Sequence, residues 1–447
     1  SSDLSMNQIA LKENNSLYYR FFRLTVINMI STIMVPLASL VSVAFLGHLS
    51  EIRHLAGVAV AANVFNCTYF IFSFLRISTS GIAAQSAGRG DREAMIMVLI
   101  RHSLIALGLS MLVLLLQYPL RELGFAMLEG SSQVKASGID YFNIRIWGAP
   151  AALVNFVLIG WFIGREESGK VVVMSAVGNL ANILLDYLTI VRWDWASIGA
   201  GFSQALSQYL ILLVGLILCA RIVSWQELRG AVSQIWDLSA FKSAFTLNSN
   251  LFIYLLCTVS VLGFFYTLSG SMGTITLAEN ALIFEVVLLG IYASDGITFA
   301  TEALAGNFQG EGKIDSLLPL VRLALITSFL MTFIFALVTV FFPQTIFGLL
   351  TDHTEVIETI DIYINWLFMV LGFGGISFVF KGYFAGLTEG KVLRNASLVA
   401  IAIGFAPISI AAWYFHSNHL LWLALSMVFL IRTIIFAIEL PRTLKQN

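Results

Sequence analysis

One apolar stretch of this sequence, GNLANILLDYLT at 178–189, contains an ionisable side chain, Asp186, one helical turn after Asn182. Removing a carboxylate from water disfavours its charged form, so a buried aspartate can exchange a proton near neutral pH. The carbonyl oxygen of a neighbouring asparagine could equally help to hold Na⁺. The pair therefore indicates a site for a small cation.

If residues 171–191 form a helix, their polar side chains share one face. At about 100° per residue, an arc of roughly 80° contains Ser175, Asn179, Asn182, Asp186 and Thr189. The stretch that follows has a face that could meet this stripe, made of Gln204, Ser207 and Gln208. Ser and Asn can also serve only as hydrogen-bonding groups between helices, so the uncharged residues have a structural alternative.

A second group of acidic residues lies in another apolar stretch. Glu285, Asp295 and Glu302 fall within an arc of about 100° on the same helical count. We expect Glu302 to be solvated at the helix end, Asp295 to lie one or two turns deeper, and Glu285 to lie near the middle. Their alternative role is an ion pair with Lys381 or Arg432.

The remaining motifs do not indicate enzymatic chemistry. GREESGKV (164–171) has the spacing of a phosphate-binding loop, but Val171 occupies the position of the Mg²⁺-binding Ser or Thr, and an apolar run precedes it instead of a strand. The six histidines have no zinc-ligand spacing, and no nucleophile with an adjacent base is recognisable. We therefore expect no enzyme, no use of ATP and no cofactor beyond a coupling ion.

The composition indicates an integral membrane protein that contacts the lipid bilayer. Of 447 residues, 58% are hydrophobic and 11% are charged, whereas soluble domains carry about 25% charged residues. Each apolar run is long enough to cross a bilayer as a helix. The predicted spans are 24–47, 55–79, 94–117, 139–163, 171–191, 197–220, 245–269, 277–301, 318–341, 361–386, 393–415 and 420–441. The net charge of -1 provides no field that would attract nucleic acid.

An internal repeat with an offset of 222 residues relates the two halves of the chain. It pairs 141–170 with 363–391, Gly160 with Gly382, and Gly164 with Gly386. We therefore predict an all-α membrane protein with twelve transmembrane helices in two pseudo-symmetric, parallel six-helix lobes. The predicted parts are an N-lobe at 1–220, a cytoplasmic amphipathic linker at 221–244 and a C-lobe at 245–447.

Lysines and arginines in the connectors predict the orientation. Most lie on the side of the N-terminus, and the other side holds Arg53, Arg121, Lys135 and Arg192. By the positive-inside rule, both termini and the linker are then cytoplasmic. Trp225 and Trp236 in the linker suit a helix at the membrane interface. We expect the cell (inner or plasma) membrane.

Five segments carry a resemblance to a known family. They are LVSVAFLGHLS (40–50), GIAAQSAGRGD (81–91), YFNIRIWGAPAALVNFVLIGWFIG (141–164), NILLDYL (182–188) and DGITFATEALAGNFQG (295–310). Together they resemble the multidrug and toxic compound extrusion (MATE) family, and the last resembles its DinF-like branch. The resemblance implies the MATE/MOP-type fold, in which two six-helix lobes surround a cavity that opens alternately to each side.

The resemblance also implies a cation site in the N-lobe. Relatives build it from an Asp of the first span, an Asn and an Asp of the fifth, and a Thr of the sixth. Here Asn182 and Asp186 match, Ser42 replaces the first Asp, and Gln204 replaces the Thr. We assign cation coupling to Asp186, Asn182, Asn179, Ser42 and Gln204, with H⁺ favoured over Na⁺.

The activity that the resemblance implies is export of small organic molecules, often cationic or amphiphilic, by a monomeric cation-coupled antiporter. The residues assigned to the substrate cavity are Asn155, Arg145, Asn63, Asn66 and Tyr254. Glu285 and Asp295 form a secondary acidic cluster that could replace Asp186 in coupling. Two other functions stay open: a lipid-linked intermediate flippase of the same superfamily, and an uncoupled channel or scaffold.

Overall fold

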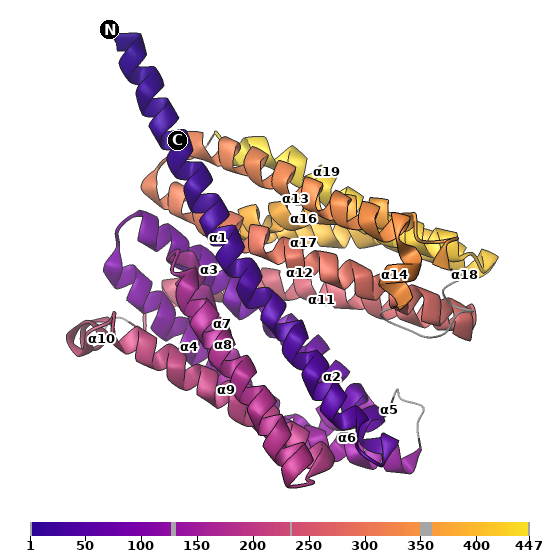
Figure 1. The fold of residues 1–447 in the computed structure, drawn as a ribbon. Coiled ribbons are helices and arrows are strands. Elements are labelled where there is room, and N and C mark those ends of the chain that lie inside the picture. The colour runs from indigo at the N-terminus through magenta and orange to yellow at the C-terminus, as the bar shows by residue number, and fades with distance from the viewer. Residues whose placement is uncertain (1, 127–130, 233–234, 349–359, 446–447) are drawn as a thin grey trace. The chain divides into compact units, whose positions relative to one another are not determined.

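The computed structural model describes residues 2–126, 131–232, 235–348 and 360–445, and these residues form helices and connectors without a β-strand (Figure 1). Among them, twelve helical segments are long and apolar enough to cross a membrane, which confirms the predicted number. The segment ends differ from the prediction most clearly in the eighth span. It covers Thr274–Glu311 and thus continues well past the predicted end at 301.

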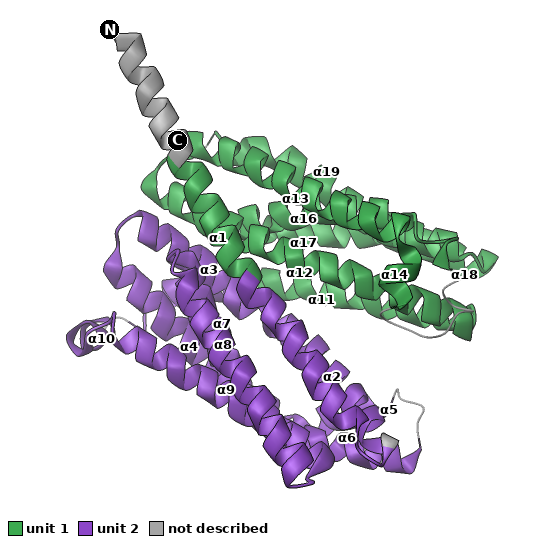
Figure 2. Cartoon of the chain, in the orientation of Figure 1, with its two compact units in different colours: residues 1–29, 246–447 green, residues 30–245 purple. Residues whose placement is uncertain are grey.

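The chain divides into two compact units (Figure 2). One consists of residues 30–245, and the other of residues 1–29 together with 246–447. The first boundary falls inside α1 (Ser2–Gly47). Within the second unit, the guanidinium of Arg20 lies 5.1 Å from the ring centroid of Phe308. The division into functional lobes at 1–220 and 245–447 stays a prediction.

The unit of residues 30–245 contains the second part of α1 and the beginning of α11. Its other helices are α2 (Ile52–Phe72), α3 (Phe74–Gly88), α4 (Arg92–Leu115), α5 (Gln117–Ala126), α6 (Ser132–Arg145), α7 (Ala149–Gly164), α8 (Ser168–Asp186), α9 (Ala196–Ala220) and α10 (Trp225–Val232). A 3₁₀ turn at Ile146–Gly148 separates α6 from α7, where the glycine and Pro150 allow the span to bend.

The other unit contains the first part of α1 and most of α11 (Leu238–Ser271). Its remaining described helices are α12 (Thr274–Glu311), α13 (Leu317–Phe341), α14 (Pro343–Gly348), α16 (Trp366–Gly386), α17 (Gly390–Val399), α18 (Ala406–Phe415) and α19 (Asn418–Thr443). Its core combines aliphatic and aromatic side chains, among them Phe265 and Trp422, which are fully buried at a centroid distance of 5.0 Å. The indole Nε1 of Trp422 donates to Asn280 Oδ1 at 2.8 Å, so this polar group is satisfied inside the core.

Close helix packing inside each unit follows the internal repeat. On α7, a Cβ at Gly160 would overlap the carbonyl oxygen of Arg76 on α3, and on α16 a Cβ at Gly382 would overlap that of Thr298 on α12. The same arrangement recurs one turn later, at Gly164 with Ser80 and at Gly386 with Glu302. Each glycine, and each residue whose carbonyl oxygen it approaches, is separated from its equivalent in the other half by the predicted offset of 222 residues. Small residues thus let the helix backbones approach closely in both halves.

The motif GREESGKV forms the turn between α7 and α8. Glu166 there has φ of 59°, and its repeat equivalent Thr388 has φ of 58°. Lys170 Nζ lies 2.6 Å from Glu167 Oε2, and Arg165 Nη2 lies 3.0 Å from Glu167 Oε1. The lysine of this motif is therefore ion-paired within its own turn, and a helix precedes the motif where a phosphate-binding loop would have a strand.

Within the described part of the linker, α10 packs against α4 (Figure 1). Arg92 donates to the Glu227 carboxylate and, through Nη2, to the carbonyl oxygen of Ile222 at 2.6 Å. Ser224 N and Oγ donate to Glu227 Oε2 at 2.8 and 2.9 Å. Hydrogen bonds from Arg92 first, and then from Ser224, lower the pKa of Glu227 to about 2.

This low pKa predicts how α10 responds to acid. A carboxyl whose folded pKa is depressed contributes stability above its unfolded pKa, and the contribution is lost as the pH falls through the folded pKa, here about 2. Hydrogen exchange across 224–232, corrected for its intrinsic pH dependence, should stay constant from about pH 7 to about pH 5. Glu227→Gln should exchange faster throughout this range.

The control is Glu93→Gln, which changes an exposed acid one residue from Arg92 and should leave exchange unaltered. Wild-type exchange that already accelerates between about pH 7 and about pH 5 would contradict the assignment of the pair.

Candidate functional site

The aspartate of the fifth span is the centre of a hydrogen-bonded network in the unit of residues 30–245. Asp186 is the last residue of α8, and it is 1% exposed. Ser42 Oγ, from α1, donates to Asp186 Oδ2, and Ser203 Oγ, from α9, donates to Asp186 Oδ1. Each carboxylate oxygen therefore has one hydroxyl donor, and three helices are linked at this point.

Asn182 extends the network one turn earlier on α8. Its Oδ1 accepts a hydrogen bond from Gln204 Nε2 at 3.2 Å and lies 3.4 Å from Ser42 Oγ. Its Nδ2 donates to Ser203 Oγ at 3.4 Å. The structure thus brings together four residues that the sequence assigned to cation coupling: Ser42, Asn182, Asp186 and Gln204.

Ser203 is a site residue that sequence reasoning missed. It is fully buried, and its Oγ lies 3.1 Å from the carbonyl oxygen of Ala200 in its own helix. Ser42 Oγ has a similar second acceptor, the carbonyl oxygen of Ala38 at 3.2 Å. Ser203 lies one turn before Ser207 on the polar face of the sixth span, but helical periodicity does not show which residue of that face meets Asp186.

The predicted polar stripe on the fifth span divides into two groups. Asn179 Nδ2 donates to the carbonyl oxygen of Ser175 at 2.8 Å, and Thr189 Oγ1 donates to that of Leu185 at 2.8 Å. These side chains are satisfied by their own helix and lie outside the Asp186 network. A π-helical turn, Tyr187–Arg192, follows Asp186 directly, and such turns are frequent at functional sites.

Two residues assigned to the substrate cavity have different surroundings in the same unit. Asn155 on α7 is buried, and its Nδ2 donates to the carbonyl oxygen of Gln208 at 2.9 Å. Arg145 at the end of α6 donates from Nη1 to the Tyr141 hydroxyl at 2.6 Å, and its guanidinium lies 4.5 Å from the ring centroid of Phe65. Asn155 is therefore bonded to the main chain of a neighbouring helix, whereas Arg145 is a cation that lies among aromatic rings.

The other three cavity candidates belong to α2 and α11. Asn63 and Asn66 lie exposed on α2. Tyr254 belongs to the other unit, where it is buried and the guanidinium of Arg432 lies 5.1 Å from its ring centroid. The assignment of these residues to one substrate cavity stays a prediction.

The acidic residues on α12 differ in their exposure. Glu285 is exposed, Asp295 is half-buried and Glu302 is fully buried. The expectation that Glu302 is solvated is wrong, because α12 continues past it and helix packing covers it. Arg432 is buried and donates from Nη2 to Thr258 Oγ1 at 3.1 Å. Within the described ranges, Glu285 makes no ion pair with this arginine.

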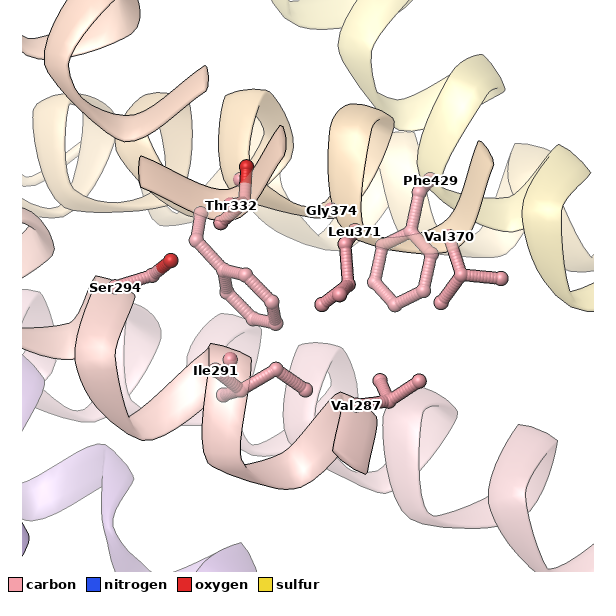
Figure 3. Close-up of a pocket in the computed structure, with 11 residues that line it drawn as sticks. Val287, Ile291, Ser294, Thr332, Val370, Leu371, Gly374 and Phe429 are labelled. Atoms are coloured by element: carbon pink, nitrogen blue, oxygen red, sulfur yellow. The ribbon is translucent and has the colours of Figure 1, made fainter. Parts of the chain in front are cut away.

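A pocket in the unit of residues 1–29 and 246–447 lies among α12, α13, α16 and α19 (Figure 3). Figure 3 shows apolar side chains around it, with the hydroxyls of Ser294 and Thr332 at one end. None of its lining residues is ionisable. The gap between these side chains has no room for even a water molecule, so it is not a substrate site in this conformation, and a residue that exchanges protons has to come from elsewhere in the chain.

Comparisons with known proteins agree with this architecture. The sequence model of the MatE family matches residues 28–188 and 251–415. DNA damage-inducible protein F of Escherichia coli (strain K12) is 31% identical over 402 residues, which cover 90% of this chain and 87% of that protein. Multidrug and toxin extrusion protein 1 of Danio rerio is 23% identical over 386 residues, which cover 84% of this chain and 63% of that protein.

A solved structure gives the same result for the fold. An outward-facing multidrug resistance MATE family transporter of the MOP superfamily superposes with a TM-score of 0.86 at 17% identity, and the superposition covers 96% of both chains. This likeness shows the predicted MATE/MOP-type fold.

Proposed function

The chain belongs to the MatE family of transporters, and from this membership we propose that it is a proton-coupled antiporter that exports organic molecules. Family membership establishes an integral membrane transporter of the multidrug and toxin extrusion type, which is not an enzyme. The proposal adds H⁺ as the coupling ion, exchange in opposite directions, and cationic or amphiphilic organic molecules as the substrates.

The observation that carries the proposal is the buried carboxyl of Asp186 with a serine hydroxyl on each oxygen. A hydroxyl has one hydrogen, and each serine has a second acceptor in its own helix: Ala38 for Ser42 and Ala200 for Ser203. When Asp186 is charged, both hydroxyls donate to it. When it is protonated, the carboxyl itself must donate, and the serine that accepts turns its hydrogen toward its own helix carbonyl.

Protonation would thereby weaken the connection of α8 to α1 or to α9. Hydrogen bonds to an ionised acceptor are roughly twice as strong as neutral ones. Binding of a proton therefore changes the relative free energy of two packings of these helices, which is the requirement for coupling. The π-helical turn beside Asp186 offers a place where α8 can adjust.

The same network supports H⁺ over Na⁺. A hard cation needs several oxygen ligands at once. Both carboxylate oxygens of Asp186 already accept from serines, and Asn182 Oδ1 accepts from Gln204. Na⁺ would need several oxygen ligands in a network whose oxygens already accept hydrogen bonds, whereas a proton needs only one carboxylate oxygen.

We extend the proposal to the cellular setting. The transporter works by alternating access as a monomer in the cell membrane, without ATP or nucleic acid, and both termini are cytoplasmic. The distribution of Lys and Arg among the connectors supports this orientation.

Transport into proteoliposomes tests the coupling ion. Under an imposed interior-acid gradient, vesicles that contain the protein should accumulate a fluorescent organic cation such as ethidium, and a protonophore should abolish accumulation. An outward Na⁺ gradient at equal pH should have no effect. Accumulation driven by Na⁺ alone would refute proton coupling, and lipid scrambling that needs no ion gradient would indicate the flippase function.

A further inference from the structure

A second pocket lies within the unit of residues 30–245, where α3 ends, α4 begins and the chain enters α11. Its volume of about 670 Å³ is in the range of small-molecule sites. The side chains that give it chemical character are Arg89, Asp91, Glu93, Arg101, Trp236 and Asp237. None of these residues belongs to the Asp186 network.

We expect this pocket to lie at the level of the lipid headgroups. It lies at the ends of three membrane-spanning segments, Arg53–Gly88, Arg92–Leu115 and Leu238–Ser271. Beside it, Trp236 is 82% exposed and Leu238 is 81% exposed. Tryptophan prefers the membrane interface, because its ring is apolar and its N–H is polar. A ligand here would have its polar part in the pocket and its apolar part in the bilayer.

Arg101 indicates that the ligand carries an anionic group. Its side chain is 9% exposed, and its Nε has no hydrogen-bond partner among the described residues. The ring of Phe241 covers one side of the guanidinium at 5.4 Å. A guanidinium in this state matches a phosphate, which accepts several hydrogen bonds. Arg89 provides a second cation at the exposed rim, where its Nη2 donates to Ser86 Oγ at 3.3 Å.

Three carboxylates in the same pocket indicate that the ligand carries a positive charge as well as a negative one. Asp91 Oδ1 accepts from Ala94 N at 3.0 Å, and Asp237 Oδ1 accepts from Ser239 N at 2.9 Å, so each has a second oxygen that can accept from a ligand. Glu93 is exposed at the rim. A ligand that carries both a phosphate and an ammonium group would satisfy both sets of charges.

We propose that this pocket binds the headgroup of a phosphatidylethanolamine-type lipid. The phosphate contacts Arg101 and Arg89, and the primary ammonium donates hydrogen bonds to the carboxylates, principally Asp237. The acyl chains extend past Leu238 into the bilayer. The site is separate from the coupling mechanism proposed above and does not depend on it.

Native mass spectrometry of the full chain, delipidated and titrated with lipids of identical acyl chains, tests this site. Wild-type protein should bind phosphatidylethanolamine more tightly than phosphatidylcholine, whose ammonium cannot donate a hydrogen bond, and more tightly than phosphatidylglycerol, which has no ammonium. Arg101→Gln should weaken phosphatidylethanolamine binding at least about tenfold. Asp237→Asn should reduce the preference over phosphatidylglycerol about threefold.

Arg192→Gln is the matched control, because Arg192 is an exposed arginine beside tryptophans at the end of another span. It should bind lipid as the wild type does. If Arg101→Gln does not fold, the exposed Arg89→Gln replaces it, with an expected loss of about threefold.

Three results would overturn the proposal. They are equal binding of phosphatidylglycerol and phosphatidylethanolamine by the wild type, unaltered binding in both arginine variants, and full competition by soluble phosphoethanolamine at the concentration of the lipid. The last would show that the pocket takes a free phosphate ester.

Discussion

Asp186→Asn is expected to abolish proton-driven uptake while the protein stays folded. Asparagine resembles the protonated carboxyl, because Oδ1 can accept from one of the serines that contact Asp186 and Nδ2 can donate to the other. The hydrogen bonds of the network then stay in the arrangement that protonation produces. Because residue 186 can no longer bind a proton, the pH gradient cannot change the relative free energy of the two helix packings. Accumulation of ethidium under an interior-acid gradient should fall to that of protein-free vesicles, with thermal stability unchanged or higher.

Two matched variants isolate this effect. Glu285→Gln makes the same carboxylate-to-amide change at an exposed position on α12, outside the network, and should retain the dependence on the pH gradient. Asn179→Ala removes a side chain whose amide donates to its own helix, and it should also transport normally. If Asp186→Asn transports at the wild-type rate with its proton dependence intact while Glu285→Gln loses it, coupling belongs to α12.

Gly160→Ala is expected to destabilise the protein by at least about 2 kcal/mol, because overpacking a helix contact forces the backbones apart. The added Cβ would meet the carbonyl oxygen of Arg76, which is main chain and cannot rotate away. Gly382→Ala should have a loss of similar size, since its Cβ would meet the carbonyl oxygen of Thr298 in the equivalent helix pair. The fraction of monodisperse protein after heating, measured by size-exclusion chromatography, reports both losses.

Gly108→Ala serves as the control, because nothing lies within 4 Å of the position of its Cβ on α4. Alanine has a higher helix propensity than glycine by up to about 1 kcal/mol, so this variant should be as stable as the wild type or more stable. The same Gly→Ala change is thus expected to lower stability at position 160 and to maintain or raise it at position 108. Equal stability of Gly160→Ala and Gly108→Ala would show that the α3–α7 contact tolerates a methyl group.

The spans and their repeat were predictable from the sequence because the signal is local. In lipid every backbone group must be bonded within its own helix, so a long apolar run is sufficient to predict a span. The glycines aligned by the repeat, such as Gly160 and Gly382, indeed make equivalent contacts. The sequence signal for the end of a helix is less local, since the end also depends on which other helices pack against it. Glu302 was therefore placed in solvent, whereas α12 continues and buries it.

The candidate site combines both kinds of information. Helical periodicity is enough to place Asp186 and Asn182 on one face of a membrane helix, because the angle between their side chains around the helix axis depends on that helix alone. The partners are set by the distances and rotations between helices, which periodicity does not encode. Ser42 was found through resemblance, and Ser203 was not found, because packing alone brings both hydroxyls to one carboxyl. For the same reason Asn179, on the predicted face, bonds to its own helix instead.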